Sequence, residues 1–263
     1  MTQGRFTSDL TTFTFAPIGT MQTVYREKFG IPRQSGLARD AWGIIELVDH
    51  DFYRLATEKL EEFSHIWVVF VFHRHDAKQW KPRIRPPRLG GSKKVGVLAS
   101  RSPHRPNPIG LSVVKLERVE RAEGKPTRIH VSGVDILDGT PVLDIKPYIP
   151  YADLIPEATG GWASAGITRV EVEWTDKALA DVEQRSRELQ IPGLKDVALQ
   201  TLELDPRPAS QRRRMPVGTP EAEGTRYGFL LEGCDVRWEI RGDRFVVLEV
   251  PQVEQSPAQD ERA

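Results

Sequence analysis

The sequence contains a single cysteine, Cys234, among its 263 residues. One thiol cannot form a disulfide framework or a cysteine-based zinc site within one chain, so we expect Cys234 to be a small core residue. No apolar run reaches the roughly 18 residues of a membrane-spanning helix. The longest run, Ile66–Phe72, fits a single buried strand. The polar segment Met1–Phe15 has no apolar stretch typical of secretory signals, so we expect a cytoplasmic protein without a membrane partner.

Two common nucleotide-binding signatures are also missing. The chain has neither the G-x-G-x-x-G fingerprint of dinucleotide-binding folds nor the G-x-x-x-x-G-K-[ST] phosphate loop. The composition is that of an ordinary globular protein, with 39% hydrophobic and 28% charged residues. Basic and acidic side chains balance at 37 each. This neutral total argues against a nucleic-acid partner only if the charges are evenly mixed along the chain.

The charges are in fact clustered. The stretch His73–Arg105 holds ten basic residues and one acid, Asp76. The ten are Arg74, Lys78, Lys81, Arg83, Arg85, Arg88, Lys93, Lys94, Arg101 and Arg105. Its proline-rich part, Pro82–Gly91, predicts an exposed loop, because proline is excluded from helix interiors and central strands. A second cluster, Arg207 with Arg212–Arg214, is predicted in another proline-rich loop. Clustering of this kind points towards an RNA partner.

Short β-branched and aromatic runs predict strands throughout the first half of the chain. The runs are Ile44–Val48, Ile66–Phe72, Val95–Leu98, Leu111–Leu116, Ile129–Ser132 and Val142–Ile145. One short helix is predicted around Tyr53–Leu60. Because few long helical patterns separate these runs, an antiparallel barrel or sandwich is favoured over a βαβ sheet.

The pattern changes after Gly160-Gly161. Helices are predicted over Asp176–Gln190, with Thr175 or Asp176 as the N-cap, and from Leu194 to Leu202. Strands are predicted over Val170–Trp174, Phe229–Ile240 and Phe245–Val250. We therefore predict a mainly β protein with an α+β part. An N-terminal antiparallel β-barrel occupies residues 11–160, a small C-terminal α+β domain occupies 166–250, and 251–263 is a flexible tail.

The segment Ala99–Ser112 is the richest in residues suited to ligand binding. Its three prolines stiffen a connection between strands, which lowers the entropy cost of binding. Arg101 and Arg105 can pair with a carboxylate or a phosphate, and Asn107 offers both a donor and an acceptor. The alternative is a proline-stabilised connector with solvated arginines.

Two further loops are candidates. Asp135–Tyr148 places three acids among apolar strand residues, although Asp138-Gly139 is also an ordinary hairpin signal. Lys28–Leu37 frames an Arg-Gln pair with glycine and proline, and its alternative is a plain surface loop. His73, His75 and His104 suggest a metal site only weakly, because acidic partners are missing, and satisfied or solvated histidines are favoured.

These loops, in this order, resemble the TsaA-like (YaeB/TrmO) family of S-adenosylmethionine-dependent tRNA adenine N6-methyltransferases. The resemblance covers about residues 11–250. The matching pieces are Lys28–Leu37, Phe63–Trp67, Arg101–Ser112 with its Arg-Pro-Asn-Pro-Ile-Gly core, Asp135–Tyr148 with its Asp-Gly-Thr-Pro piece, and Asp205–Ala209.

The resemblance implies a non-Rossmann β-barrel methyltransferase that binds S-adenosylmethionine, uses no metal and forms a homodimer. It implies methyl transfer to N6 of threonylcarbamoyl-adenosine at position 37, in the anticodon stem-loop of tRNA. The implied cofactor-binding residues are Pro32, Arg33, Gln34, His73, Arg74, Arg101, Leu111, Asp135, Ile136, Leu137 and Asp138. The implied catalytic residues are Asp138, Asp205 and Arg207.

One position departs from the family pattern. Ser210 follows Ala209 where the resemblance leads us to expect an aromatic residue, which bears on substrate choice rather than on cofactor binding. The main alternative is an S-adenosylmethionine-binding RNA-interaction module that does not methylate tRNA, or that acts on a different small molecule. A zinc hydrolase built on the three histidines is a more distant alternative.

Overall fold

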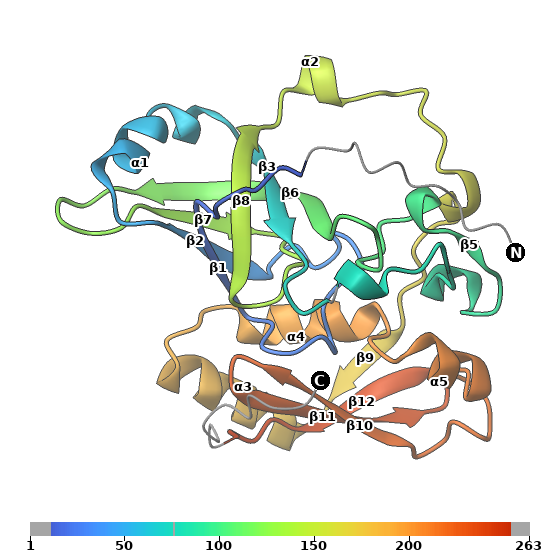
Figure 1. Ribbon diagram of the computed structural model, residues 1–263. Helices are drawn as coiled ribbons and strands as arrows, with labels where there is room; N and C mark the ends of the chain where they lie inside the picture. The colour runs from blue at the N-terminus through green and yellow to red at the C-terminus, as the bar shows by residue number, and fades with distance from the viewer. Residues whose placement is uncertain (1–11, 76, 254–263) are drawn as a thin grey trace, which may run out of the picture.

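The N-terminal half is a closed barrel of six antiparallel strands. The structure is a computed structural model that describes residues 12–75 and 77–253. The strands follow the order β1-β2-β7-β6-β3-β8 around the barrel, where β8 pairs again with β1 (Figure 1). Their bounds are Gly19–Thr23 (β1), Trp42–Leu47 (β2), His65–Val71 (β3), Ile109–Glu120 (β6), Arg128–Ser132 (β7) and Thr140–Pro147 (β8). The prediction of a mainly β fold with an antiparallel barrel is confirmed.

Alternating side chains fill the barrel. Along β3, Ile66, Val68 and Phe70 are buried while the residues between them are only partly covered. This is the period of two expected for a strand with one face on a core. Gly110 lies opposite Phe70 in the β3–β6 register, and a Cβ atom there would come within 2.3 Å of the Phe70 ring. Glycine is therefore required at this point of β6.

The connections between barrel strands carry short elements. Helix α1 (Asp51–Ala56) begins after His50, whose Nδ1 accepts a hydrogen bond from the Phe52 backbone N–H at 3.1 Å. Between β3 and β6, the strands β4 (Arg83–Ile84) and β5 (Val95–Gly96) form a small hairpin. Helix α2 (Pro150–Asp153) follows β8. The described residues of this half also form five 3-10 turns: Leu60–Glu62, Ala77–Gln79, Pro87–Leu89, Val97–Ala99 and Gly161–Ala163.

The C-terminal part packs helices on a four-stranded sheet of order β10-β11-β12-β9, in which β9 runs parallel to β12. Its bounds are Glu171–Trp174 (β9), Asp176–Glu188 (α3), Leu194–Glu203 (α4), Ala209–Arg214 (α5), Arg226–Leu231 (β10), Cys234–Arg241 (β11) and Arg244–Glu249 (β12). Thr175 caps α3, because its Oγ1 accepts a hydrogen bond from the Ala178 N–H at 3.1 Å. Cys234 is fully buried, as expected, and burial raises the pKa of its thiol to about 11.

Three predicted elements are wrong in detail. The single strand predicted over Phe229–Ile240 is a hairpin, because Glu232 and Gly233 both adopt positive φ angles and reverse the chain between β10 and β11. The predicted strand Val95–Leu98 keeps only two strand residues before a 3-10 turn. Arg212–Arg214 end helix α5 instead of lying in a loop.

Two further differences concern the ends of elements. The helix predicted around Tyr53–Leu60 is α1 followed by a separate 3-10 turn. Of the predicted tail, residues 251–253 are held by backbone hydrogen bonds to the β10–β11 hairpin, Asp235 N–H to Pro251 O and Val253 N–H to Gly233 O, each 2.9 Å. Residues 254–263 lie outside the described part. Among the described helices, none is long and apolar enough to cross a bilayer.

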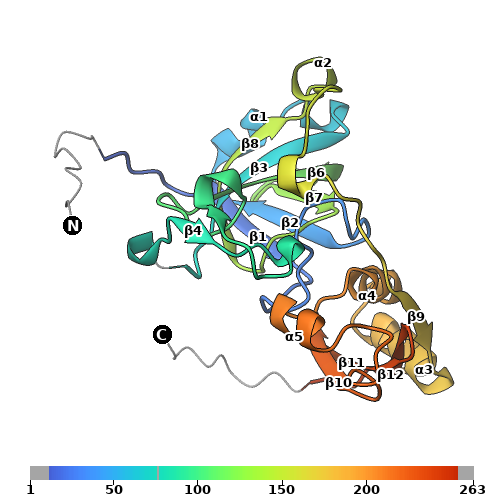
Figure 2. The same cartoon turned by 90° about the vertical axis from the view of Figure 1, so that its right-hand side faces the viewer.

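The two halves share one hydrophobic core. Buried residues of the barrel and of the C-terminal sheet form a single continuous cluster. The connection between β1 and β2, residues 24–41, lies at the junction (Figure 2). There Arg26 pairs with Glu232 at 2.6 Å, and Glu27 Oε1 accepts from the Leu230 N–H at 2.9 Å. These two contacts tie the start of the loop that contains the Arg-Gln pair to the β10–β11 hairpin.

Candidate functional site

Three loops meet at one end of the barrel. They are residues 24–41 between β1 and β2, 72–108 between β3 and β6, and 133–139 between β7 and β8. Because neighbouring strands are antiparallel, β1, β3 and β7 all finish at this end, and β2, β6 and β8 all begin there. The three loops contain or adjoin three of the N-terminal motifs, Lys28–Leu37, Arg101–Ser112 and the start of Asp135–Tyr148, whereas Phe63–Trp67 lies at the opposite end, where β3 begins. We refer to this end as the motif end.

Hydrogen bonds tie the loops to one another. Gln34 Oε1 accepts from Arg101 Nη1 at 2.6 Å, which joins the first loop to the second. The Gly36 N–H donates to the Gly133 carbonyl at 2.8 Å, which joins the first loop to the third. The structure thus brings Arg33-Gln34, Arg101 and the segment from Asp135 together.

Asp135 is the half-buried acid of the motif end. Its Oδ1 accepts a hydrogen bond from Ser112 Oγ at 2.6 Å. Burial raises the pKa of Asp135 above its usual 3.8, while the Ser112 bond, the Ser35 backbone and the Arg101 charge act in the opposite direction. A carboxylate that is partly desolvated gains more from a ligand that donates hydrogen bonds than a solvated one does. Ser112 was missed as a functional residue, although it ends the Arg101–Ser112 motif.

Asp138, three residues further on, has a different environment. Its Oδ1 accepts from the buried Thr23 N–H at 2.9 Å, and its Oδ2 pairs with Arg26 at 2.6 Å. Its own N–H donates to the Tyr25 carbonyl at 2.9 Å. These contacts tie the β7–β8 loop to the end of β1. Both oxygens of Asp138 are therefore engaged within the chain.

The remaining predicted residues of the third loop, Ile136 and Leu137, make hydrogen bonds within the chain through their backbone carbonyls. Ile136 is 1% exposed, and its carbonyl accepts from Thr23 Oγ1 at 2.9 Å. The Leu137 carbonyl accepts from Thr140 Oγ1 at 2.6 Å. Leu111 of β6 differs, because its side chain is 52% exposed at the motif end. An exposed leucine beside polar loops offers an apolar surface to a ligand.

The first loop places a buried proline beside an unusual arginine. Pro32 is buried, and Arg33 Nη2 donates to the Arg207 carbonyl at 3.5 Å. Desolvation and the nearby Arg212 cation lower the pKa of Arg33 to about 10, while Asp205 acts in the opposite direction. Arg33 stays a cation at neutral pH and faces the C-terminal part of the molecule.

His73 and Arg74 directly follow β3. Partial burial, followed by the Arg74 and Lys28 cations, lowers the pKa of His73 and so favours its neutral ring. Lys28 Nζ donates to the Arg74 carbonyl at 3.2 Å, which again joins the first two loops. The rings of His75 and His104 lie 3.9 Å apart between centroids. Across residues 12–75 and 77–253, no group of three or more His, Cys, Asp or Glu side chains is arranged to hold a metal ion.

Asp205 and Arg207 form a buried ion pair away from the barrel strands. Arg207 is 1% exposed, and its Nε and Nη2 donate to the two Asp205 oxygens at 2.8 and 2.7 Å. Its Nη1 donates to the Met215 carbonyl at 2.9 Å, and the guanidinium lies over the Tyr227 and Phe245 rings. This closed arrangement fixes the turn before α5. Ser210, on α5, is exposed.

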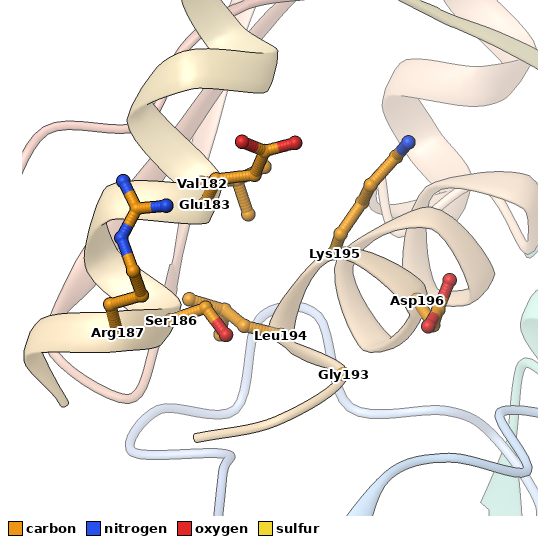
Figure 3. Close-up of a pocket in the computed structure, with 8 residues that line it drawn as sticks. All are labelled: Val182, Glu183, Ser186, Arg187, Gly193, Leu194, Lys195 and Asp196. Carbon is orange, nitrogen blue, oxygen red and sulfur yellow. The ribbon is translucent and has the colours of Figure 1, made fainter. Parts of the chain in front are cut away.

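A hollow of about 310 Å³ lies elsewhere, between α3 and α4 (Figure 3). It is lined by Val182, Glu183, Ser186, Arg187, Gly193, Leu194, Lys195 and Asp196. None of the predicted site residues lines it.

The chain matches known proteins over nearly its whole length. A sequence model of the tRNA-methyltransferase O N-terminal domain matches residues 20–154, and one of the TrmO C-terminal domain matches residues 167–253. RcsF of Pseudomonas aeruginosa, whose name describes an S-adenosylmethionine-dependent methyltransferase, is 44% identical over 242 residues, 91% of this chain and 98% of RcsF.

Two further relatives agree. The tRNA (adenine(37)-N6)-methyltransferase of Escherichia coli is 38% identical over 241 residues, 90% of this chain and 97% of that protein. A crystal structure of TrmO from Pseudomonas aeruginosa has a TM-score of 0.74 and 39% identity, and covers 92% of this chain and all of the other.

Proposed function

This chain belongs to the TrmO family, and from that premise we propose that it is a tRNA (adenine(37)-N6)-methyltransferase whose cofactor site is the motif end. The enzyme transfers a methyl group from S-adenosylmethionine to N6 of adenine 37 in tRNA. The observation that supports the site is the convergence of three motif loops around Asp135, Gln34 and Arg101.

The residues of the motif end fit the chemistry of S-adenosylmethionine. A half-buried carboxylate, Asp135, suits ribose hydroxyls or amine donors, while the cations Arg101 and Arg33 suit a carboxylate. The exposed Leu111 suits the face of a purine. When bound, S-adenosylmethionine supplies a methyl group already activated by a sulfonium charge. The chain mainly has to align that group with the adenine N6 and exclude water.

The protein also has to accept the proton that N6 loses as the new N–C bond forms. Asp138 and Asp205 stay predictions for this role, and Arg207 for a catalytic one. Each carboxylate already pairs with an arginine, Asp138 with Arg26 and Asp205 with Arg207. Asp138 lies beside Asp135 in the third loop, so it is the nearer of the two to the proposed cofactor site.

The specific substrate is adenosine 37 that already carries the threonylcarbamoyl group. The reaction takes place in the cytoplasm, where the tRNA is found. The resemblance of the Arg101–Ser112 and Asp135–Tyr148 motifs supports this choice. The target base lies in a single-stranded loop, where an enzyme can splay it out of the stack.

The active form is a homodimer. Apolar side chains remain exposed at the motif end, where Leu98 is 78%, Leu111 52% and Ile109 39% exposed. A second copy that covers them would close the site against water. Light scattering should give twice the 29.7 kDa of one chain, and a monomer mass at micromolar concentration would contradict this assembly.

Nucleoside analysis tests the activity directly. In tRNA from a strain that lacks this protein, mass spectrometry should show the threonylcarbamoyl-adenosine nucleoside lighter by one methyl group, and the gene restored on a plasmid should return the methyl group. An unchanged nucleoside profile would refute the methyltransferase. If the purified protein then still bound S-adenosylmethionine, the binding module without catalysis would replace it.

A further inference from the structure

Two groups of cations lack acidic partners. Within the described residues, no carboxylate lies within ion-pair distance of the basic side chains of the β4–β5 hairpin segment, residues 83–96. These are Arg83, Arg85, Arg88, Lys93 and Lys94, and all five are exposed. The same holds for Arg212, Arg213 and Arg214 of α5, of which the last two are exposed. Holding like charges together without counter-charges is unfavourable unless an anion binds there.

These two groups are neighbours in space, although more than a hundred residues separate them in sequence. Arg213 Nη1 donates to the Gly90 carbonyl, and a Cβ on Gly91 would lie 3.4 Å from the Ala209 Cβ. Both glycines adopt positive φ angles, 66° and 68°, which turns the hairpin segment towards α5. Figure 2 shows α5 just below the hairpin, at the junction of the two halves.

The basic surface also reaches the motif end. Arg212 is close enough to Arg33 to lower the pKa of that arginine, and Arg33 donates to the Arg207 carbonyl just before α5. Arg88 Nη2 donates to the Gly166 carbonyl at 3.4 Å, which attaches the hairpin segment to the chain that links the two halves. Cations therefore continue from the hairpin across α5 to the loop of the proposed cofactor site.

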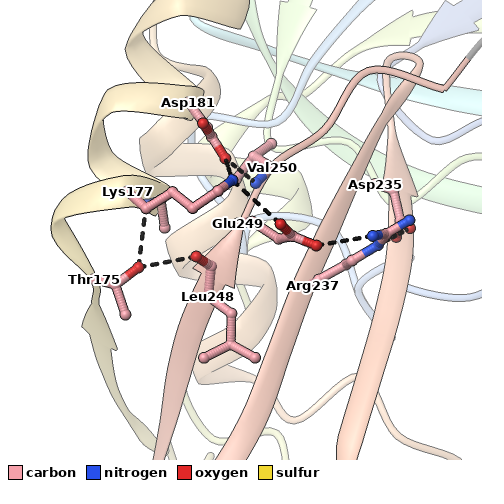
Figure 4. A network of polar contacts seen from close by, with 9 residues as sticks. Thr175, Lys177, Asp181, Asp235, Arg237, Leu248, Glu249 and Val250 are labelled. Atoms are coloured by element: carbon pink, nitrogen blue, oxygen red, sulfur yellow. Dashed lines mark hydrogen bonds and ion pairs between the residues drawn. The ribbon is translucent and has the colours of Figure 1, made fainter.

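The C-terminal sheet shows the opposite arrangement. Its arginines are matched by acids: Arg226 and Arg241 both pair with Glu239, and Arg244 pairs with Glu173. Figure 4 shows the same pattern beside them, where Arg237 binds Asp235 and Glu249, and Lys177 binds Asp181 and Glu249. Exposed arginines on this sheet are thus neutralised, whereas those of the hairpin segment and α5 are not.

We propose that the hairpin segment and helix α5 form one phosphate-binding surface that spans the junction of the two halves and ends at Arg33. It holds the backbone of the RNA from both halves at once and delivers the loop base to the motif end. This inference rests on the proposed function, because it takes the polyanion to be the tRNA substrate. In this arrangement the C-terminal part contacts the RNA phosphates through Arg212–Arg214, whereas Arg207 is buried and takes no part in the surface.

Binding of an anticodon stem-loop RNA, measured against salt concentration, tests the surface. Replacing Arg212, Arg213 and Arg214 together by Gln should weaken binding at least about tenfold at low salt. It should also lower the slope of log affinity against log salt by about 2 to 3, since each lost phosphate contact removes roughly 0.7–0.9. Replacing Arg85, Arg88 and Lys93 by Gln should act similarly, and the combined variant should lose the product of both factors.

The matched control changes the same charge on the neutralised sheet. Arg226, Arg241 and Arg244 replaced together by Gln should leave both the affinity and the salt slope unchanged within about twofold. Affinity for S-adenosylmethionine, measured by calorimetry, should stay within about twofold of wild type in all of these variants, which also checks that they are folded.

The outcomes distinguish a failure of the phosphate-binding surface from a failure of the proposed methyltransferase function. A wild-type protein that methylates tRNA, with an α5 variant that keeps full RNA affinity and salt slope, would refute the surface and leave the proposed function standing. An equal loss in the α5 variant and in the control would also refute it, because net charge alone would then explain binding. A wild-type protein that neither binds the stem-loop nor methylates tRNA would refute the proposed function itself.

Discussion

The motif end and the Asp205–Arg207 pair use the same residue types for opposite purposes. At the motif end, Ser112 is the only side chain of the described residues that hydrogen-bonds Asp135, through one carboxylate oxygen, and Arg101 makes one hydrogen bond to Gln34. In the buried pair, both Asp205 oxygens and three Arg207 nitrogens make hydrogen bonds within the chain. Acid and arginine motifs with free bonding capacity can bind a ligand, whereas saturated ones hold the fold together.

The largest effect is expected where the saturated pair is broken. Asp205→Ala leaves the buried Arg207 charge without its carboxylate, which should lower the free energy of unfolding by about 3–5 kcal/mol. Urea denaturation followed by fluorescence measures this loss. The double variant Asp205→Asn with Arg207→Met should lose less, because no unpaired charge remains. Nearly wild-type stability in Asp205→Ala would show that the pair does not hold the fold together and would break the comparison.

A smaller effect is expected at Asp138, which belongs to the motif end but is saturated. Asp138→Ala removes the acceptor of the buried Thr23 N–H and the Arg26 partner, and should cost about 1–3 kcal/mol of unfolding free energy. Asp138→Asn keeps an acceptor for Thr23 and should cost only about 1 kcal/mol. Equal losses in the two variants would contradict this account of Asp138, and thermal denaturation can distinguish them.

The smallest effect on stability, and one of opposite sign, is expected at Asp135. Its pKa is raised in the folded state, so folding favours the protonated form and stability contributed by this group is lost as the pH rises through that pKa. Asp135→Asn should therefore match wild type at acidic pH and gain up to about 1 kcal/mol at pH 7. A loss of stability at pH 7 would mean that Asp135 is structural. Unfolding measured at several pH values gives the sign.

The sequence predicted the elements that hydrophobic periodicity and helix capping determine. Alternating runs such as Ile66–Phe72 located barrel strands, and of the two N-cap candidates, Thr175 and Asp176, the structure shows Thr175. The hairpin at Glu232-Gly233 was missed because an acid that adopts a positive φ gives no strong local signal. Strand β1 was missed because its five residues include one large apolar side chain, Met21, so no apolar run marks the strand.

The site was predictable in its motifs but not in its contacts. Resemblance pointed to Asp135, Asp138, Asp205 and Arg207 alike, and only tertiary structure separates the open acid from the saturated ones. The role of Ser112 depends on which side chain faces it across the barrel end, and the nearness of α5 to Gly90 depends on a contact across 123 residues. Neither can be read from local pattern.

Calorimetric titration with S-adenosylmethionine tests the central claim most directly, because it compares the open acid with a saturated one at the same barrel end. Asp135→Asn should weaken cofactor affinity by about tenfold or more, the loss expected when a hydrogen bond to a charged acceptor is removed. Asp138→Asn should stay within about threefold of wild type, since its contacts lie within the chain. Unchanged affinity in Asp135→Asn together with a large loss in Asp138→Asn would contradict the account.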